Sequence, residues 1–166
     1  MTIQIGDRLP DATLRETTEF GDACPVSPKT IAVAEAAKGK RIVIFGLPGA
    51  FTPTCSAKHV PGYLANLDQL KAKGVDEIWC VAVNDGYVMA EWGRAQHALG
   101  KIRFLGDGAA EFAKKLGLDV DLTASGMGIR LKRFSMLVDD GVVKALNVEA
   151  PGKFEVSDAT TMLGQV

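Results

Sequence analysis

Two apolar runs rich in β-branched residues, each followed by a segment with helical spacing, limit what this chain can fold into. The first run is Ile42-Val43-Ile44-Phe45, and the second covers residues 78–83. Short runs of this kind are typical of buried central strands. Apolar residues then recur at helical intervals between residues 60 and 70 and again between residues 88 and 99. This repeated order of strand and helix predicts an α/β protein.

A third strand-helix pair and a hairpin complete the pattern. Residues 102–105 favour a strand, and residues 109–116 favour a helix that Gly117 closes. Asp139-Asp140-Gly141 separates two β-rich runs, which favours a tight antiparallel hairpin. An extended N-terminal segment near residues 3–14 and a short helix over residues 159–163 complete the chain. We predict a thioredoxin-like fold, in which a mixed central sheet carries helices on both faces.

Composition sets the size of the protein and argues against several classes of partner. The chain has 166 residues, of which 47% are hydrophobic, so it can bury one sizeable core. No repeat or linker divides it, and we expect a single domain over residues 1–166. Its 19 basic and 20 acidic residues are scattered, which points away from nucleic acid and from anionic lipid. Without a membrane-length apolar stretch or a secretory signal, we expect a cytoplasmic protein.

The cysteine pattern favours reduced or reactive thiols. The three cysteines are Cys24, Cys55 and Cys80, an odd number with no C-x-x-C spacing. This pattern fits neither a secreted disulfide framework nor a zinc site. Because only two histidines could add nitrogen ligands, we expect no metal and no other cofactor.

Cys55 follows a strand and a Pro/Gly turn, in or just before the first turn of the next helix. Free backbone N–H groups and the helix dipole stabilise an anion at such a place, which favours the nucleophilic thiolate. Pro53 fixes the start of the helix, and Thr52 and Thr54 bring hydroxyl groups close to the sulfur. Spacing alone leaves two interpretations open, a catalytic thiol or a small apolar core residue beside helix-capping threonines.

The eight residues from Pro48 to Cys55, PGAFTPTC, resemble the active-site signature of the peroxiredoxins. The similarity is to the subfamily that contains mammalian peroxiredoxin 5 and the plant type II enzymes. It extends across nearly the whole chain, through residues 58–62, 83–85, 133–136 and 146–149. The resemblance implies a thiol peroxidase that reduces hydrogen peroxide and alkyl hydroperoxides in antioxidant defence and redox homeostasis.

By this resemblance, four residues form the catalytic set. Cys55 matches the peroxidatic cysteine, which attacks the peroxide and becomes a sulfenic acid. Thr52 would hydrogen-bond the bound peroxide, Pro48 would shield the thiolate, and Arg133 would stabilise the thiolate and the developing negative charge. Arg130 is a rival for that last role, and we interpret it as a solvated loop cation.

Three further features each have a structural and a functional interpretation. His59 lies four residues after Cys55, so a cysteine-histidine pair is conceivable, but we expect it to support the pocket rather than act as the base. Gly126 and Gly128 are too few to indicate a dinucleotide site, and we interpret their segment as a flexible hinge. Aromatic residues near the site, including Phe51, could lie in the core or at an interface, and we expect them in the core.

The route by which the sulfenic acid is reduced is left open by the sequence. In the segment that matches the one carrying the resolving cysteine of mammalian peroxiredoxin 5, Ser157 stands near the expected place, so that route is missing here. Cys80 matches the second cysteine of the plant enzymes and could resolve Cys55, or it could be a buried structural residue. Cys24 has no counterpart and is interpreted as incidental. If neither of these thiols reaches Cys55, glutathione or glutaredoxin would reduce the sulfenic acid directly, with thioredoxin as an alternative reductant.

Other functions with the same thiol are a dithiol oxidoreductase, a non-enzymatic redox sensor and a Cys/His hydrolase. The first needs a partner cysteine beside Cys55, and Ser56-Ala57-Lys58 supplies none. The hydrolase needs an orienting partner for His59 that the local sequence lacks. We therefore favour the peroxidase, and the family resemblance implies a homodimer.

Overall fold

A computed structural model describes the whole chain, residues 1–166. Its centre is a seven-stranded sheet with the order β2-β1-β5-β4-β3-β8-β9, and a separate two-stranded hairpin pairs β6 with β7. The three central strands β3, β4 and β5 are parallel, and the flanking pairs are antiparallel. The strands are β1 (Thr13–Glu16), β2 (Lys29–Ala32), β3 (Arg41–Gly46), β4 (Glu77–Ala82), β5 (Arg103–Gly106), β6 (Asp119–Leu122), β7 (Gly128–Leu131), β8 (Phe134–Asp139) and β9 (Val142–Val148).

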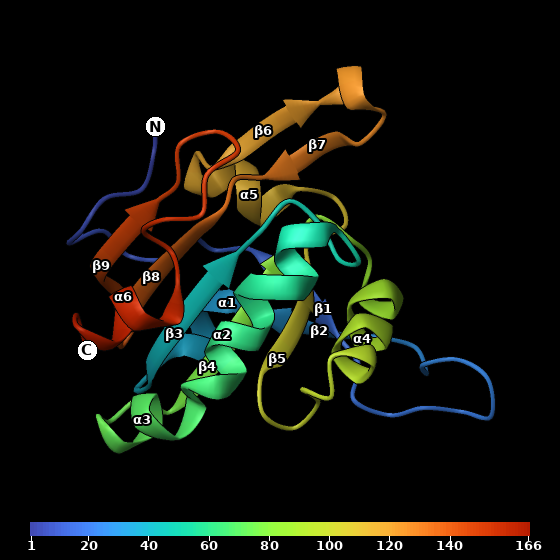
Figure 1. The fold of residues 1–166 in the computed structure, drawn as a ribbon, viewed down its shortest axis with the longest axis horizontal. Coiled ribbons are helices and arrows are strands. Elements are labelled where there is room, and N and C mark those ends of the chain that lie inside the picture. The colour runs from blue at the N-terminus through green and yellow to red at the C-terminus, as the bar shows by residue number, and fades with distance from the viewer.

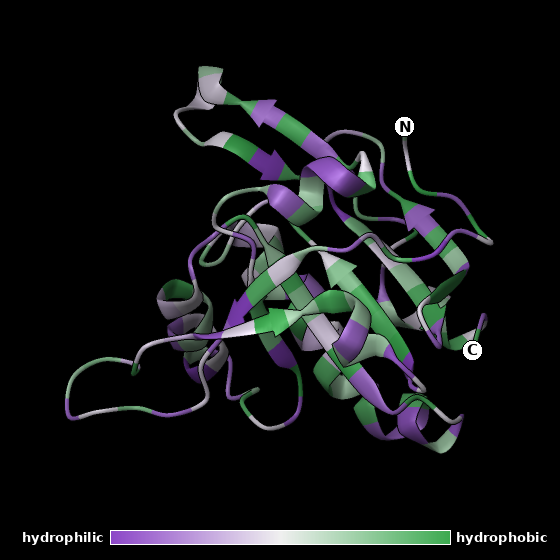
Figure 2. Ribbon diagram, turned by 180° about the vertical axis from the view of Figure 1, so that it is seen from behind, coloured by the Kyte–Doolittle hydropathy of each residue, from purple (hydrophilic) through white to green (hydrophobic).

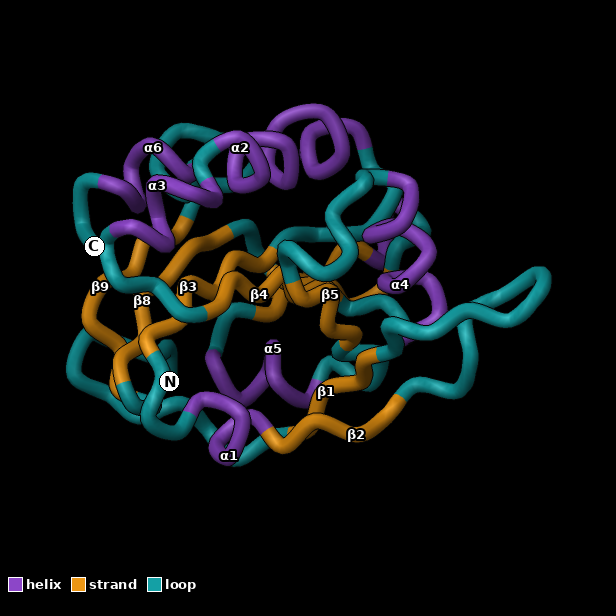
Figure 3. The backbone as a smooth tube through the Cα atoms, turned by 90° about the horizontal axis from the view of Figure 1, so that it is seen from below, coloured by secondary structure: helices purple, strands orange, loops and turns teal.

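Helices cover both faces of the sheet (Figure 1). The helices are α1 (Val33–Ala37), α2 (Val60–Ala65), α3 (Leu67–Ala72), α4 (Gly86–Ala95), α5 (Glu111–Leu116) and α6 (Ala159–Leu163), with a π-helical turn at Cys55–His59 and a 3₁₀ turn at Thr123–Ser125. Figure 3 shows α2, α3, α4 and α6 on one face and α1 and α5 on the other. The predicted α/β class, with a mixed sheet between helices, is confirmed. None of these helices has both the length and the apolar character that crossing a membrane requires.

The central strands alternate between two hydrophobic clusters, one on each face of the sheet. In β3, Ile42 and Ile44 belong to the cluster under α1 and α5, whereas Val43 and Phe45 belong to the cluster under α2, α4 and α6. This alternation follows from the two-residue period of a strand. The central strands are accordingly green over much of their length in Figure 2. Both clusters pack against the same seven-stranded sheet, one on each face.

Several predicted elements agree with the structure, and two do not. The β8–β9 turn places Asp140 and Gly141 at φ values of 47° and 79°, as the tight hairpin requires. The predicted long helix after Cys55 is interrupted at Asn66, which separates α2 from α3. The segment around residues 126–128, predicted as a hinge, belongs to the β6–β7 hairpin, in which Gly126 follows the 3₁₀ turn and Gly128 begins β7.

Strand pairing brings distant parts of the sequence to one end of the sheet. The last residue of β3, Gly46, is opposite Phe134, the first residue of β8. Phe134 is also opposite Val148, the last residue of β9. The loop after β3, the short link before β8 and the loop after β9 therefore meet at this end of the sheet.

Candidate active site

Cys55 lies close to the start of the helical segment that follows β3. The helical conformation begins at Pro53, and a π-helical turn covers Cys55–His59. Such π-helical turns occur frequently at functional sites. The cysteine is fully buried, with 0% of its surface exposed. The predicted position of Cys55 in the first turn of the helix agrees with the structure.

Arg133 contacts the sulfur directly. Its Nη2 donates a hydrogen bond to Cys55 Sγ at 3.2 Å, and its Nη1 donates to His59 Nδ1 at 3.0 Å. The guanidinium also lies over the Phe154 ring, 5.8 Å from its centroid. A permanent cation with fixed donors stabilises a thiolate and any negative charge that develops next to it. The structure thus brings together Cys55 and Arg133, which are 78 residues apart in the sequence.

His59 is neutral and is held by partners on both ring nitrogens. Burial, and after it the positive charge of Arg133, lower the pKa of His59 to about 3, although the hydrogen bond to the Ser157 carbonyl partly opposes the shift. Because Arg133 can only donate, His59 Nδ1 accepts and the proton resides on Nε2, which lies 3.0 Å from the Ser157 carbonyl oxygen. The nitrogen that a base would use is therefore occupied, and the histidine orients Arg133.

Glu149 organises the loop that supports His59. Its carboxylate accepts hydrogen bonds from the backbone N–H groups of Glu155, Val156 and Ser157 and from the Ser157 hydroxyl. Burial alone would raise the pKa of Glu149, but these hydrogen bonds outweigh burial and hold the pKa below its ordinary value. The Ser157 carbonyl, fixed in this way, also accepts from Tyr63 Oη at 3.0 Å.

The role of Glu149 was missed by the sequence analysis. The residue falls within the stretch that resembles the family, but a single acidic residue after a strand gives no local sign of its partners. Those partners lie six to eight residues further along the chain, in a loop with no regular structure. Glu149 connects this loop to Arg133 as well, because its own N–H donates to the Arg133 carbonyl at 3.0 Å.

The loop between β3 and the helical segment that begins at Pro53 is fixed by polar contacts. Thr52 Oγ1 donates to the Gly49 carbonyl at 2.7 Å. The Ala50 N–H donates to Asn84 Oδ1 at 2.9 Å. Pro48 and Thr52 are both partly buried beside the site.

Arg130 is part of this support, so its interpretation as a solvated loop cation is wrong. Its Nη1 donates to the Pro48 carbonyl at 3.0 Å and its Nε donates to the Met127 carbonyl at 2.9 Å. A Cβ atom at Gly49 would come within 2.7 Å of Arg130 Nη1, so a glycine allows this close approach. The arginine lies on β7, and the hairpin therefore braces the active-site loop.

The other two cysteines occupy very different environments. Cys80 is fully buried in β4, between Phe45 of β3 and Phe104 of β5. Burial raises the pKa of Cys80 well above its ordinary value. Cys24 is exposed in the long loop between β1 and β2. All three thiols are free, and no disulfide is formed.

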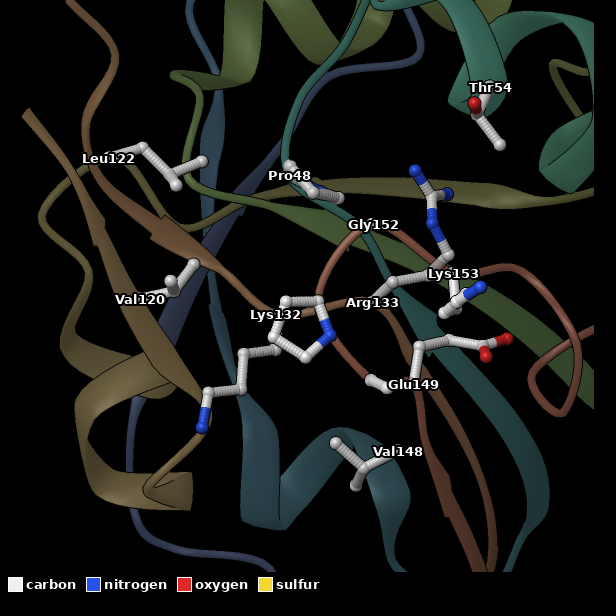
Figure 4. Close-up of a pocket in the computed structure, with 12 residues that line it drawn as sticks. Pro48, Thr54, Val120, Leu122, Lys132, Arg133, Val148, Glu149, Gly152 and Lys153 are labelled. Carbon is white, nitrogen blue, oxygen red and sulfur yellow. The ribbon is translucent and has the colours of Figure 1, made fainter. Parts of the chain in front are cut away.

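A cavity of about 310 Å³ opens next to Arg133 (Figure 4). Its lining includes Pro48 and Thr54 from the active-site segment and Arg133 itself. Apolar side chains come from β6 and β9, and the loop after β9 closes the remaining side. Cys55 does not itself line the cavity, and Arg133, which does, connects this space to the buried sulfur through its hydrogen bond to Cys55 Sγ.

Phe51 differs from the sequence-based expectation that it belongs to the core. Its side chain is 56% exposed, and its backbone has a φ of 60°. This left-handed conformation is uncommon for a residue with a side chain. It turns the ring outward beside Trp92, at 6.4 Å between ring centroids.

Replacing Glu149 with glutamine is expected to lower the free energy of unfolding by about 1–3 kcal/mol at pH 7, because an amide donor would then face N–H donors. The pKa of Glu149 in the folded protein lies below its value of about 4.3 in the unfolded chain. The carboxylate therefore stabilises the folded state fully above pH 4.3, and this stabilisation is lost as the pH falls through the folded pKa. Urea unfolding at pH 7 and pH 3 measures the difference, which should shrink at pH 3. Glu155→Gln, an exposed change in the same loop, is the control. An equal difference at both pH values would contradict the assignment.

Comparisons with known proteins cover almost the whole chain. The Redoxin family model matches residues 4–163. Peroxiredoxin-2B of Arabidopsis thaliana is 44% identical over 161 residues, which are 97% of this chain and 96% of the relative. The crystal structure of reduced Prx3 from Vibrio vulnificus in complex with H2O2 is 50% identical, covers 98% of each chain and has a TM-score of 0.91. Peroxiredoxin 5 from Alvinella pompejana is 31% identical, covers 98% of this chain and 97% of its own, and has a TM-score of 0.84.

Proposed function

This chain belongs to the peroxiredoxins of the Redoxin family and is a thiol-dependent peroxidase, and on that premise we propose that Cys55 is the thiol that attacks the hydroperoxide. The observation that carries the assignment is the 3.2 Å hydrogen bond from Arg133 Nη2 to Cys55 Sγ. Neither of the other cysteine sulfurs accepts a hydrogen bond from a cationic side chain, and one of these cysteines is exposed in a loop.

The reaction needs a thiolate and a stabilised leaving group. The Cys55 thiolate attacks the terminal oxygen of the hydroperoxide, a sulfur–oxygen bond forms and the oxygen–oxygen bond breaks. The departing alkoxide or hydroxide takes up a proton and leaves as alcohol or water, and Cys55 is left as a sulfenic acid. Trapping that acid with dimedone after one equivalent of hydrogen peroxide tests the assignment. Label on Cys24 or Cys80 instead of Cys55 would overturn it.

Thr52, Pro48 and Arg133 have distinct parts in this proposal. The Thr52 hydroxyl uses its proton on the Gly49 carbonyl, so its oxygen lone pairs are left to accept a hydrogen bond from the peroxide. Arg133 offers fixed donors to the sulfur and to the oxygen that becomes negative. Pro48 lines the cavity without a backbone donor and limits access of water to the sulfur. The neutral His59 holds Arg133 in place and takes no proton.

For the resetting step, we propose that an external thiol reduces the sulfenic acid. Cys80 is fully buried in the central sheet, and burial keeps its thiol protonated, so it is a poor nucleophile. Two external thiols would instead restore Cys55, with release of one water and one disulfide. Glutathione with glutaredoxin fits this cycle, and thioredoxin is the second candidate reductant.

Replacing Cys80 with serine is therefore expected to leave peroxide turnover with glutathione and glutaredoxin within about twofold of the wild type, a change under about 0.5 kcal/mol. Steady-state peroxide consumption measures this. Mass spectrometry of the wild type after one equivalent of peroxide should show glutathione adducts or sulfenic acid on Cys55, with no link to Cys80. The matched control is Cys24→Ser. A Cys55–Cys80 disulfide, together with lost turnover in the Cys80 variant, would establish internal resolution instead.

Two further parts of the proposal concern assembly and location. A homodimer through the surface around Phe51 is supported by the exposure of this aromatic ring next to the active-site segment. The cytoplasmic location stays a prediction from the sequence.

A further inference from the structure

The Tyr63 hydroxyl is a buried polar group that the proposed reaction does not use. Tyr63 lies on α2, four residues after His59, and 0% of its surface is exposed. Its ring stacks on Phe45, with 4.2 Å between the ring centroids and 5° between the ring planes. A phenylalanine would make the same apolar contacts, whereas a buried hydroxyl needs a hydrogen-bond partner. The stacking therefore accounts for the aromatic ring but not for its hydroxyl.

The partner of this hydroxyl also holds His59. Tyr63 Oη donates to the Ser157 carbonyl oxygen at 3.0 Å, and His59 Nε2 lies 3.0 Å from the same oxygen. A carbonyl oxygen has two lone pairs, so it can accept from both donors. Burial raises the pKa of Tyr63 well above its ordinary value, so the hydroxyl keeps its proton and remains a donor at neutral pH. Ser157 lies just before α6, which is beside α2 (Figure 3), and the hydroxyl thus ties these two parts of the chain together.

Hydrogen bonds continue from this carbonyl to the reactive sulfur. His59 Nδ1 accepts from Arg133 Nη1 at 3.0 Å, and Arg133 Nη2 donates to Cys55 Sγ at 3.2 Å. Hydrogen bonds away from water are strong and influence one another, so the position of one acceptor affects the next bond in the series. A displaced Ser157 carbonyl would tilt the His59 ring and, with it, the guanidinium.

We propose that Tyr63 is a positioning residue for the peroxidatic reaction, and that its hydroxyl, by holding the Ser157 carbonyl, fixes His59 and through it Arg133. The inference rests on the proposed role of Cys55. Tyr63 touches neither the sulfur nor the peroxide and transfers no proton. It acts only through the direction in which the guanidinium donors point.

The test is Tyr63→Phe, which removes one oxygen atom and keeps the stacked ring. The second-order rate of Cys55 oxidation by hydrogen peroxide should fall about 3- to 10-fold at pH 7, the factor that corresponds to one buried hydrogen bond. The pH at which this rate is half its maximum should rise by about 0.3 to 1 unit, because a poorly held Arg133 stabilises the thiolate less. Stopped-flow oxidation over a range of pH measures both quantities.

The shift in the pH profile distinguishes positioning from a purely structural role. Loss of stability would lower the fraction of folded protein but would leave the profile of the folded molecules unchanged. The other ionisable groups that act on the thiol or on His59 are Cys80, Glu149 and Asp158, besides Arg133 itself. All of them are present in both proteins, so a difference between the two profiles comes from the missing hydroxyl.

The matched control is Tyr87→Phe, because Tyr87 is the other tyrosine of the chain and lies 47% exposed on α4. It should keep the rate and the pH profile of the wild type. A second comparison places Tyr63→Phe in the Arg133→Met protein, where it should cause no further slowing because the group through which it acts is gone. If thermal unfolding shows that Tyr63→Phe is not folded, 4-aminophenylalanine at position 63 replaces it. This weaker donor of similar shape should shift the profile in the same direction by a smaller amount.

An unchanged rate and pH profile in the folded position-63 variant would overturn the inference. Equal slowing by Tyr63→Phe with and without Arg133 would overturn it as well. The wild type provides the separate reading: fast oxidation of Cys55 together with an unchanged variant defeats only the inference. Slow oxidation of Cys55 in the wild type would defeat its peroxidatic role, and the inference with it.

Discussion

Replacing Cys55 with serine is expected to reduce peroxide consumption to the rate of the buffer and reductant alone. A serine hydroxyl has almost the size of the thiol, so the packing beneath Arg133 is retained. It does not ionise near neutral pH, however, and it cannot accept the peroxide oxygen to form a sulfenic acid. Steady-state peroxide consumption with glutathione and glutaredoxin measures the loss.

The control for this variant is Cys24→Ser, which removes an exposed thiol from the loop between β1 and β2. That protein should keep full activity, since none of the hydrogen bonds around Cys55 involves Cys24. Thermal unfolding should show that both variants are folded. If folded Cys55→Ser still turns over peroxide above background, another residue performs the attack.

Replacing Arg133 with methionine should slow the oxidation of the active-site thiol by about 100- to 1,000-fold, the usual cost of losing a donor aimed at developing negative charge. Methionine fills much of the same space but offers no donor to Cys55 Sγ, and it leaves His59 Nδ1 without its partner. Arg133→Lys should fall between methionine and the wild type, because it keeps the charge and loses the two-pronged donor geometry. Stopped-flow oxidation by hydrogen peroxide measures all three proteins.

Arg94→Met is the matched control, because Arg94 is an exposed arginine of α4 that pairs with Glu91. Its oxidation rate should equal that of the wild type. If Arg133→Met reacts as fast as this control, the hydrogen bond to the sulfur has no part in the rate.

Much of the central fold could be predicted because its strands and turns are indicated by residues that are neighbours in the sequence. Runs such as Ile42-Val43-Ile44-Phe45 identify buried strands, and the Asp140-Gly141 pair fixes the conformation of the β8–β9 turn. The β6–β7 hairpin was missed because its strands are only four residues long and Gly126 and Gly128 suggested flexibility. The alternation of Asp and apolar residues in Asp119–Leu122 was the available strand signal.

The active-site residues that belong to one sequence motif could be predicted, whereas those that depend on contacts between distant parts of the chain could not. Cys55 and its threonines belong to one continuous segment, so resemblance identified them together. Arg130 looked like a solvated cation because its contact with Pro48 depends on how the hairpin docks against the active-site loop. Glu149 acts through a loop without a sequence signature. Phe51 is exposed because of a backbone conformation that its residue type does not indicate.

The most direct test of the peroxidatic role of Cys55 is its second-order rate of oxidation by hydrogen peroxide in the folded, reduced protein. Trp92 suits stopped-flow detection, because its Nε1–H donates to Ser56 Oγ, beside Cys55, at 3.0 Å. Cys24, exposed in the same molecule, supplies an internal reference thiol whose oxidation is followed by mass spectrometry. We predict that Cys55 reacts orders of magnitude faster than Cys24. Equal rates for the two thiols would contradict the central claim.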